Sequence, residues 1–302
     1  MSGYHDHLVR AIAREHAVRV VVAFTRDLVA EGAARHGLSP AATCALGRAL
    51  TSGALLATLT KGPERVTLQL SGDGPIGTIT VDANDDGAVR GYAQHPASGP
   101  MLPAGRSAVA ETLGRHGVVN VLRDLGLKEL YQGQVALVTG EIDEDVEAYL
   151  RTSEQVPSAL GCEVVLDDAG RVEAAAGILV QAMPEGDPDS VREAQHALRT
   201  GRLRDLLVGG QRDARAIAEQ IYVAEPLELV GEERTIRFQC RCSQERIGDM
   251  LKLLTTVDLD EMIAEGKPAE VTCNFCNTHY RVEPSELERI RASIAGGPRQ
   301  SN

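Results

Sequence analysis

Residues 240–242 read CRC and residues 273–276 read CNFC, so four of the six cysteines of this 302-residue chain stand in two tight pairs. Thiolates at such short spacings can each hold one metal ion from two sides, and four thiolates around a zinc ion form a common structural site. The two pairs therefore predict a single Zn²⁺ site, one ion per chain, on Cys240, Cys242, Cys273 and Cys276.

Spacing alone leaves two roles open for this site. It can be a permanent structural zinc site or a redox switch. A disulfide across C-x-C closes a small and strained ring, and strained disulfides are the labile, regulatory kind. Oxidation of both pairs would remove all four ligands at once. His279 follows Cys276 closely, but four thiolates already complete the site, so we interpret it as a surface histidine.

The segment between the pairs predicts two short helices packed over the metal. Its apolar positions are Ile247, Leu251, Leu254, Leu259, Met262 and Ile263. A domain of about 70 residues buries too little apolar surface to rely on its core, so metal binding would supply much of its folding free energy. We place the start of this domain near residue 231.

The N-terminal part predicts a mixed α/β domain with a mainly antiparallel sheet. Residues 39–60 form the clearest helix, because Ser39 is a good N-cap and Pro40 suits the first helical position. This helix is apolar on most sides and should be buried. We also expect a strand at 17–25, helices at 26–36 and 141–155, a strand meander at 65–94, strands near 117–123 and 131–139, and a hairpin at 162–182 around DDAG.

A boundary is expected at residues 183–190, MPEGDPDS, because Pro and Gly stand there among acids. Residues 190–222 are helical in pattern, with glycines at 201, 209 and 210 that each cost a helix interior about 1 kcal/mol. Such helices need a surface to dock on. Leu206, Leu207 and Ile217 should therefore pack on the sheet of the N-terminal domain. The expected class is α+β, with domains at 1–183, 184–230 and 231–302.

Composition excludes several classes of function. The formal net charge is −12, which opposes binding to nucleic acid and to anionic lipid. The N-terminus lacks the apolar core of a signal peptide, and no apolar run reaches the roughly 18 residues of a membrane span. We therefore expect a cytoplasmic protein, where paired cysteines indicate metal or redox chemistry. The lone Cys44 and Cys162 are interpreted as buried small hydrophobes.

Two other functions were weighed for the cysteine module. A zinc ribbon that binds nucleic acid needs a basic face, whereas residues 231–302 hold ten Lys and Arg against twelve Asp and Glu. A zinc enzyme needs an open coordination position, and four thiolates leave none. No Walker A motif is present either. We therefore expect no enzyme activity and no catalytic residues.

The chain resembles the 33 kDa redox-regulated chaperonin, or heat-shock protein 33, family. The resemblance lies in CRC, the spacer and CNFC, in their contexts CSQERIGDMLKLL and CNFCNTHY, and in LQLSGDGPIGTITVDAN and AYLRTSEQVPS. It implies a cytosolic ATP-independent holdase that binds unfolding client proteins during oxidative stress. It also implies zinc on the four cysteines in the reduced state. Oxidation would then produce two disulfides, release of zinc, linker unfolding and a homodimer. Proximity and the family both favour Cys240–Cys242 and Cys273–Cys276.

Overall fold

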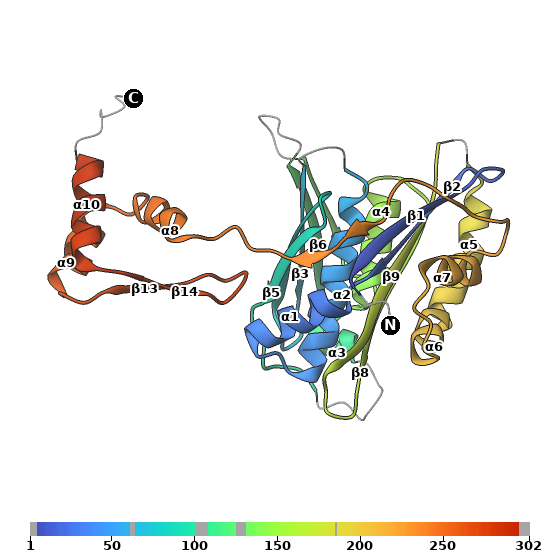
Figure 1. Ribbon diagram of the computed structural model, residues 1–302, viewed down its shortest axis with the longest axis horizontal. Coiled ribbons are helices and arrows are strands. Elements are labelled where there is room, and N and C mark those ends of the chain that lie inside the picture. Colours follow the sequence, from blue (N-terminus) through green and yellow to red (C-terminus); the bar gives the residue numbers. More distant parts are fainter. Residues whose placement is uncertain (1–4, 61–63, 101–107, 125–130, 185, 296–302) are drawn as a thin grey trace. The chain divides into compact units, whose positions relative to one another are not determined.

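The computed structural model describes residues 5–60, 64–100, 108–124, 131–184 and 186–295 (Figure 1). The chain divides into two compact units, Met1–Gln239 and Cys240–Asn302, which are called unit 1 and unit 2 below. Helices and mainly antiparallel sheets confirm the predicted α+β class. Residue 185 of the predicted boundary and residues 296–302 of the predicted last domain lie outside the described residues.

The described part of unit 1 contains two six-stranded sheets rather than the single sheet expected. The first sheet has the order β10-β1-β2-β9-β8, with β11 also paired to β1. Its strands are β1 (His7–Ala13), β2 (Val18–Phe24), β8 (Ser158–Leu166), β9 (Val172–Ala182), β10 (Glu228–Leu229) and β11 (Arg234–Thr235). All of its pairings are antiparallel.

The second sheet has the order β12-β5-β4-β3-β6-β7. Its strands are β3 (Arg65–Gly72), β4 (Thr78–Asn84), β5 (Ala88–Ala93), β6 (Gly117–Asp124), β7 (Tyr131–Ala136) and β12 (Arg237–Phe238). The pairings are antiparallel except that of β12 with β5, which is parallel. The predicted meander and the two strands that follow it are confirmed.

Helix α2 (Pro40–Ala57) lies between the two sheets and contacts both (Figure 1). Ser39 caps it by accepting a hydrogen bond from Ala42 N at 3.1 Å, as its position predicts. Small residues of α2 let its backbone approach both sheets closely. A Cβ added at Gly47 would stand 2.8 Å from Val164 of the first sheet. One added at Gly53 would stand 2.6 Å from Val81 of the second. The helix is buried along its length after Pro40.

Three further helices complete the core region of unit 1. They are α1 (Arg26–His36), α3 (Val109–Leu113) and α4 (Ile142–Thr152). The predicted helices at 26–36 and 141–155 are thus confirmed, whereas α3 was not predicted. The acidic first turn of α4 suits the partial positive charge at a helix N-terminus. Side chains of α4 also contact the helices that follow β9.

Helices α5 (Pro188–Arg199), α6 (Arg202–Val208) and α7 (Ala214–Ile221) are called the linker helices here. They cover the face of the first sheet that α2 leaves free (Figure 1). Leu206, Leu207 and Ile217 are buried in one cluster with side chains of β2 and β9, which confirms the predicted docking surface. Gly201 and Gly210 lie between helices at φ 85° and 83°, and Gly209 is the C-cap of α6. The penalty expected for interior glycines therefore does not apply; the glycines end the helices instead.

Residues 223–239, called the strap here, run from the linker helices to the end of unit 1. Within the strap, β10 and β11 pair with β1, and β12 pairs with β5, so the strap closes an edge of each sheet. Ile236 is buried, and the guanidinium of Arg35 stacks over the ring of Phe238. The sequence did not predict these strands, nor β1.

Unit 2 contains the two predicted short helices, a hairpin and a last helix. They are α8 (Gln244–Leu251), α9 (Thr256–Ala264), β13 (Ala269–Thr272), β14 (His279–Val282) and α10 (Pro284–Ala295). Its core consists of Ile247, Leu251, Leu259, Val282, Leu287 and Ile290. Leu254 is 36% exposed and lies outside this core, contrary to expectation. Among the helices of the described residues, none has both the length and the apolar content that a membrane span requires.

Candidate metal centre

The four cysteines come from two separate segments of unit 2. Cys240 and Cys242 lie just before α8, where Ser243 caps the helix by accepting a hydrogen bond from Arg246 N at 3.2 Å. Cys273 and Cys276 lie in the turn between β13 and β14. The hairpin and the start of α8 therefore bring together residues that are about thirty positions apart.

The turn of the hairpin is held by its own backbone. Cys273 N donates to Thr278 O at 2.9 Å, and Asn277 N donates to Cys273 O at 2.8 Å. Asn277 adopts φ 57°, a left-handed conformation that asparagine tolerates better than most residues. These bonds shape the turn that carries the second cysteine pair.

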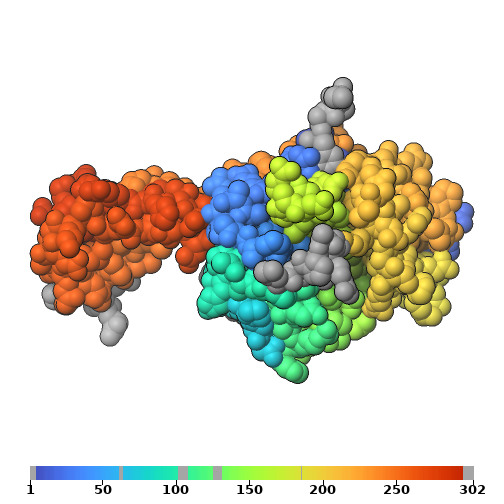
Figure 2. All heavy atoms as spheres, turned by 90° about the horizontal axis from the view of Figure 1, so that it is seen from below, coloured from blue at the N-terminus to red at the C-terminus, as the bar shows by residue number. Residues whose placement is uncertain are grey.

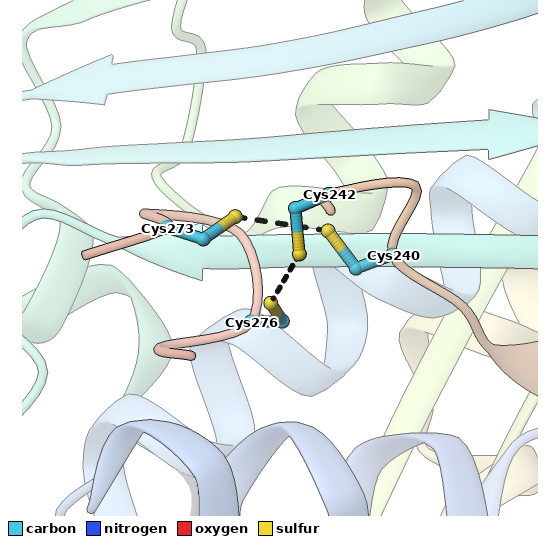
Figure 3. Close-up of side chains that lie close together, drawn as sticks. All are labelled: Cys240, Cys242, Cys273 and Cys276. Atoms are coloured by element: carbon cyan, nitrogen blue, oxygen red, sulfur yellow. Dashed lines mark hydrogen bonds between the residues drawn. The ribbon is translucent and has the colours of Figure 1, made fainter. Parts of the chain in front are cut away.

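The four sulfurs converge on one point (Figure 3). Cys240 Sγ lies 3.7 Å from Cys273 Sγ, and Cys242 Sγ lies 3.3 Å from Cys276 Sγ. All four sulfurs lie within 4.8 Å of one another. A tetrahedron with zinc–sulfur bonds of about 2.3 Å has edges of about 3.8 Å. The arrangement therefore fits a tetrahedral metal ion bound by four thiolates.

The electrostatics of the cluster also suit a cation. Burial raises the pKa of Cys242 to about 12 and also raises the pKa of Cys273. Burial acts in the same direction at Cys276, but hydrogen bonds with Thr278, Cys242 and Cys273 together outweigh it and lower the pKa to about 7. Four thiolates this close repel one another, so they can all ionise only beside a compensating positive charge. A divalent metal ion provides that charge.

Comparison with known proteins now identifies the family. The family model described as Hsp33 protein matches residues 6–283, which include both cysteine pairs. The chain belongs to the Hsp33 family. The family is therefore established for nearly the whole chain, and the resemblance noted in the sequence is confirmed.

Relatives in this family match over almost their full lengths. The 33 kDa chaperonin of Geobacter sulfurreducens is 40% identical, with 96% of this chain and 96% of that protein covered. The 33 kDa chaperonin of Bacillus subtilis is 36% identical, with 95% and 98% covered. The crystal structure of the 33 kDa chaperonin of Thermotoga maritima superposes with a TM-score of 0.85 at 32% identity, covering 97% of this chain and 100% of that one.

Sequence reasoning missed two residues beside the cysteines of this Hsp33 chain: Thr278, whose Oγ1 lies 3.2 Å from Cys276 Sγ, and Tyr280. The Tyr280 hydroxyl donates a hydrogen bond to Cys242 Sγ at 2.9 Å. This contact with Cys242 raises the pKa of Tyr280 to about 12, so the hydroxyl keeps its proton and remains a donor at neutral pH. CNFCNTHY contains the tyrosine, but nothing in its spacing indicates that its side chain reaches the first cysteine pair.

If the four cysteines hold the zinc ion that their spacing predicts, we expect Tyr280→Phe to weaken its binding about tenfold, because groups that hydrogen-bond to metal ligands typically contribute that much or more. Competition with a chromophoric zinc chelator measures the affinity. Tyr131→Phe is the matched control, since Tyr131 is 45% exposed and belongs to unit 1. Equal affinity in a well-folded Tyr280→Phe variant would show that the hydrogen bond does not support the site.

The remaining candidates of this Hsp33 chain lie outside the cluster. His279 is exposed, and its Nδ1 lies 2.9 Å from Thr272 Oγ1. Cys44 and Cys162 are buried in the core of unit 1, as predicted. Cys162 Sγ lies 3.4 Å from Ser52 Oγ, and burial raises the pKa of this thiol, so it stays protonated.

A second group of possible metal ligands in the described residues was not predicted. His5, His7 and Glu233 bring their ligand atoms within 4.8 Å of one another. His5 Nε2 and Glu233 Oε1 are 2.7 Å apart, and both side chains are about half exposed. This contact ties the segment before β1 to the strap, and an ordinary histidine–carboxylate pair accounts for it.

Proposed function

We propose that this Hsp33-family chain is a redox-regulated, ATP-independent chaperone, a holdase that binds unfolded or partly folded clients during oxidative stress. The name 33 kDa chaperonin, which its relatives carry, supports the chaperone role. The observation that supports redox control is the meeting of four thiols in the small unit 2. Thiols are both metal ligands and oxidisable groups, so one chemical change can alter the whole unit.

In the inactive, reduced state we assign one Zn²⁺ per chain to Cys240, Cys242, Cys273 and Cys276. Bound zinc would contribute folding free energy on the order of 10 kcal/mol, as in other small metal-binding domains. Unit 2 needs such a contribution, because its core rests on six buried apolar side chains. Sulfur separations near the edge length of a zinc–thiolate tetrahedron support this assignment.

In the activating step, the two thiolates of each cysteine pair give two electrons to one peroxide molecule, which takes up two protons from the solvent and leaves as two waters. The product is one sulfur–sulfur bond per pair. We propose the pairs Cys240–Cys242 and Cys273–Cys276. The sulfur contacts at 3.7 Å and 3.3 Å both join opposite pairs, so these contacts do not favour this choice. Once zinc leaves and the unit loosens, closing a short loop costs less entropy than closing one of more than thirty residues.

Loss of the folded unit 2 would then release the linker helices. We assign residues 1–183 to a client-binding and dimerising core, residues 184–230 to a metastable linker and residues 231–302 to the switch. The linker helices have 12, 7 and 8 residues, lengths at which isolated helices are marginal in water. Their departure would expose the apolar cluster that they now cover. We further propose a cytoplasmic protein that forms a homodimer when oxidised, without enzyme activity and without nucleic-acid or membrane partners.

Peroxide treatment of warmed, zinc-loaded protein is expected to release close to one zinc per chain and to switch on suppression of client aggregation. Zinc release is followed with a chromophoric chelator, and aggregation by light scattering of a thermally unfolding client. Peptide mapping should find the two neighbouring-pair disulfides. Treatment with a thiol reductant and zinc should reverse all three changes.

Two results would contradict the proposal. Equal suppression of client aggregation by the reduced and oxidised forms would show that oxidation does not control activity. The metal centre would then be a permanent structural site. Predominant cross-links between the two cysteine pairs would refute the proposed pairing. A Cys44→Ser variant is the control, because that buried cysteine lies in unit 1 and should not alter either response.

A further inference from the structure

The linker helices dock on unit 1 through a mixture of apolar and charged contacts. Val191, Leu203 and Leu207 are buried in one cluster with apolar side chains of β8 and β9. Figure 2 shows the linker, in yellow, as a broad surface of unit 1 that meets the green parts of the core. The apolar part alone would accept many sequences, because the hydrophobic effect has no direction.

Two arginines of the linker restrict how the linker helices can dock on unit 1. Arg199 of α5 pairs with Glu147 of α4 at 3.0 Å, and Arg204 of α6 pairs with Glu163 of β8 at 3.1 Å. The two carboxylate side chains are only 4% and 11% exposed. Gln195 supports the first pair by donating to Glu147 at 2.9 Å. Charge-assisted hydrogen bonds at such sheltered positions are stronger than pairs in open solvent.

Both carboxylates are also held by the core itself. Glu147 accepts a hydrogen bond from Leu160 N at 3.0 Å, and Glu163 pairs with Arg48 at 3.2 Å. These two contacts do not involve the linker. The carboxylates therefore keep their positions when the linker leaves, and what they lose is the guanidinium of Arg199 or Arg204.

A recess of about 310 Å³ between the core and the linker adds to this negative surface. The described core side chains that line it include four carboxylates and a single cation, Arg48. The carboxylates are Glu141, Asp143, Glu144 and Glu163. With the linker in place, Arg199 and Arg204 offset part of this charge. Without the linker, an apolar sheet face lies beside an acidic recess that has lost two cations.

We infer that the linker occupies a client-binding surface, and that the clients accepted there are amphipathic segments with Arg or Lys at the border of an apolar face. The inference rests on the proposed function, since it requires the linker to leave. Segments bordered by Glu would meet Glu147 and Glu163 as like charges and would be rejected. With the linker docked, its Arg199 and Arg204 make the ion pairs that the basic residues of a client segment would make in its place.

The test uses full-length, peroxide-oxidised protein and three fluorescent peptides with one shared apolar helical face. The face is bordered by Arg, by Gln or by Glu. Anisotropy titration should show the Arg peptide binding about tenfold more tightly than the Gln peptide, with the Glu peptide weakest. Raising the salt concentration should erase the advantage of Arg. Equal affinities for the Arg and Gln peptides at low salt would overturn the inference.

A matched pair of variants assigns the preference to this surface. Glu147→Gln retains an oxygen for Leu160 N but removes the charge, so the advantage of the Arg peptide should fall severalfold. Glu173→Gln changes an exposed acid of β9 and should leave the advantage unaltered. An advantage that survives Glu147→Gln would refute the assignment. If Glu147→Gln does not fold, the salt series on the unaltered chain still decides the charge preference.

The outcomes separate this inference from the proposed function. Oxidised protein that suppresses aggregation but binds the Arg and Gln peptides equally retains the chaperone role and loses the charge preference. Oxidised protein that neither suppresses aggregation nor binds any of the peptides refutes both.

Discussion

Cys273→Ser is expected to abolish stoichiometric zinc binding and to unfold unit 2 while the core at residues 1–183 stays folded. A serine hydroxyl is a poor replacement for a thiolate, and the remaining three sulfurs leave the tetrahedron open. The lost metal contribution is on the order of 10 kcal/mol, which exceeds the net stability of a few kcal/mol that so small a unit obtains from its apolar core after the entropy cost of folding. Metal analysis and amide hydrogen exchange of residues 240–295 measure the two effects.

The controls for this variant change other potential ligands. His279→Ala should retain one zinc per chain, because His279 is not among the four clustered groups. His5→Asn should do the same, because His5 belongs to the separate group in unit 1. A full complement of zinc in Cys273→Ser would refute the four-cysteine assignment.

Leu207→Asp is expected to give suppression of client aggregation without any oxidant, in protein that still holds its zinc. Leu207 is 1% exposed in the apolar cluster beneath the linker helices. Replacing it with a carboxylate removes its burial and places an unpaired charge among apolar side chains. The cost is about 3 kcal/mol or more, which shifts the docking equilibrium by more than about a hundredfold.

Val208→Asp is the matched control for this experiment. It introduces the same charge one position further along α6, where the side chain is 63% exposed, so docking should persist and the reduced variant should stay inactive. Hydrogen exchange should show lost protection over residues 190–222 in Leu207→Asp and normal protection in Val208→Asp. If Leu207→Asp loses protection over residues 190–222 but does not suppress client aggregation, release of the linker is not sufficient for chaperone activity. That result would contradict the proposed mechanism.

Local signals explain which parts of the fold could be predicted. Ser39 and Pro40 mark the start of α2 in adjacent positions, and DDAG marks the hairpin of β8 and β9. The strap could not be predicted in this way, because its strands have two residues each, too few for a periodic pattern. β1 was missed because Arg10 interrupts its apolar alternation and its edge is completed only by the distant strap.

The meeting of the four cysteines was predictable for a different reason. Two cysteine pairs in one acidic chain restrict the possible chemistry so strongly that residue type and spacing identify the cluster. The hydroxyl of Tyr280 carries no comparable signal, because its contact with Cys242 depends on how the hairpin lies against the start of α8. The role of the carboxylates beneath the linker could not be predicted from the sequence either. Glu147 and Glu163 look like ordinary charged positions of a helix and a strand until the linker covers them.

The pairing of the strap with β1 also has a consequence during translation, because the two segments are synthesised far apart in time. The ribosome delivers His7–Ala13 among the first residues and Glu228–Thr235 near the end of the chain. At roughly 5–20 residues per second, the outer edge of β1 waits on the order of 10–40 s for its partner strands. During that interval the nascent chain carries an open sheet edge, a feature that invites association with other chains. A protein proposed to guard others against aggregation thus passes through a vulnerable stage of its own at every round of translation.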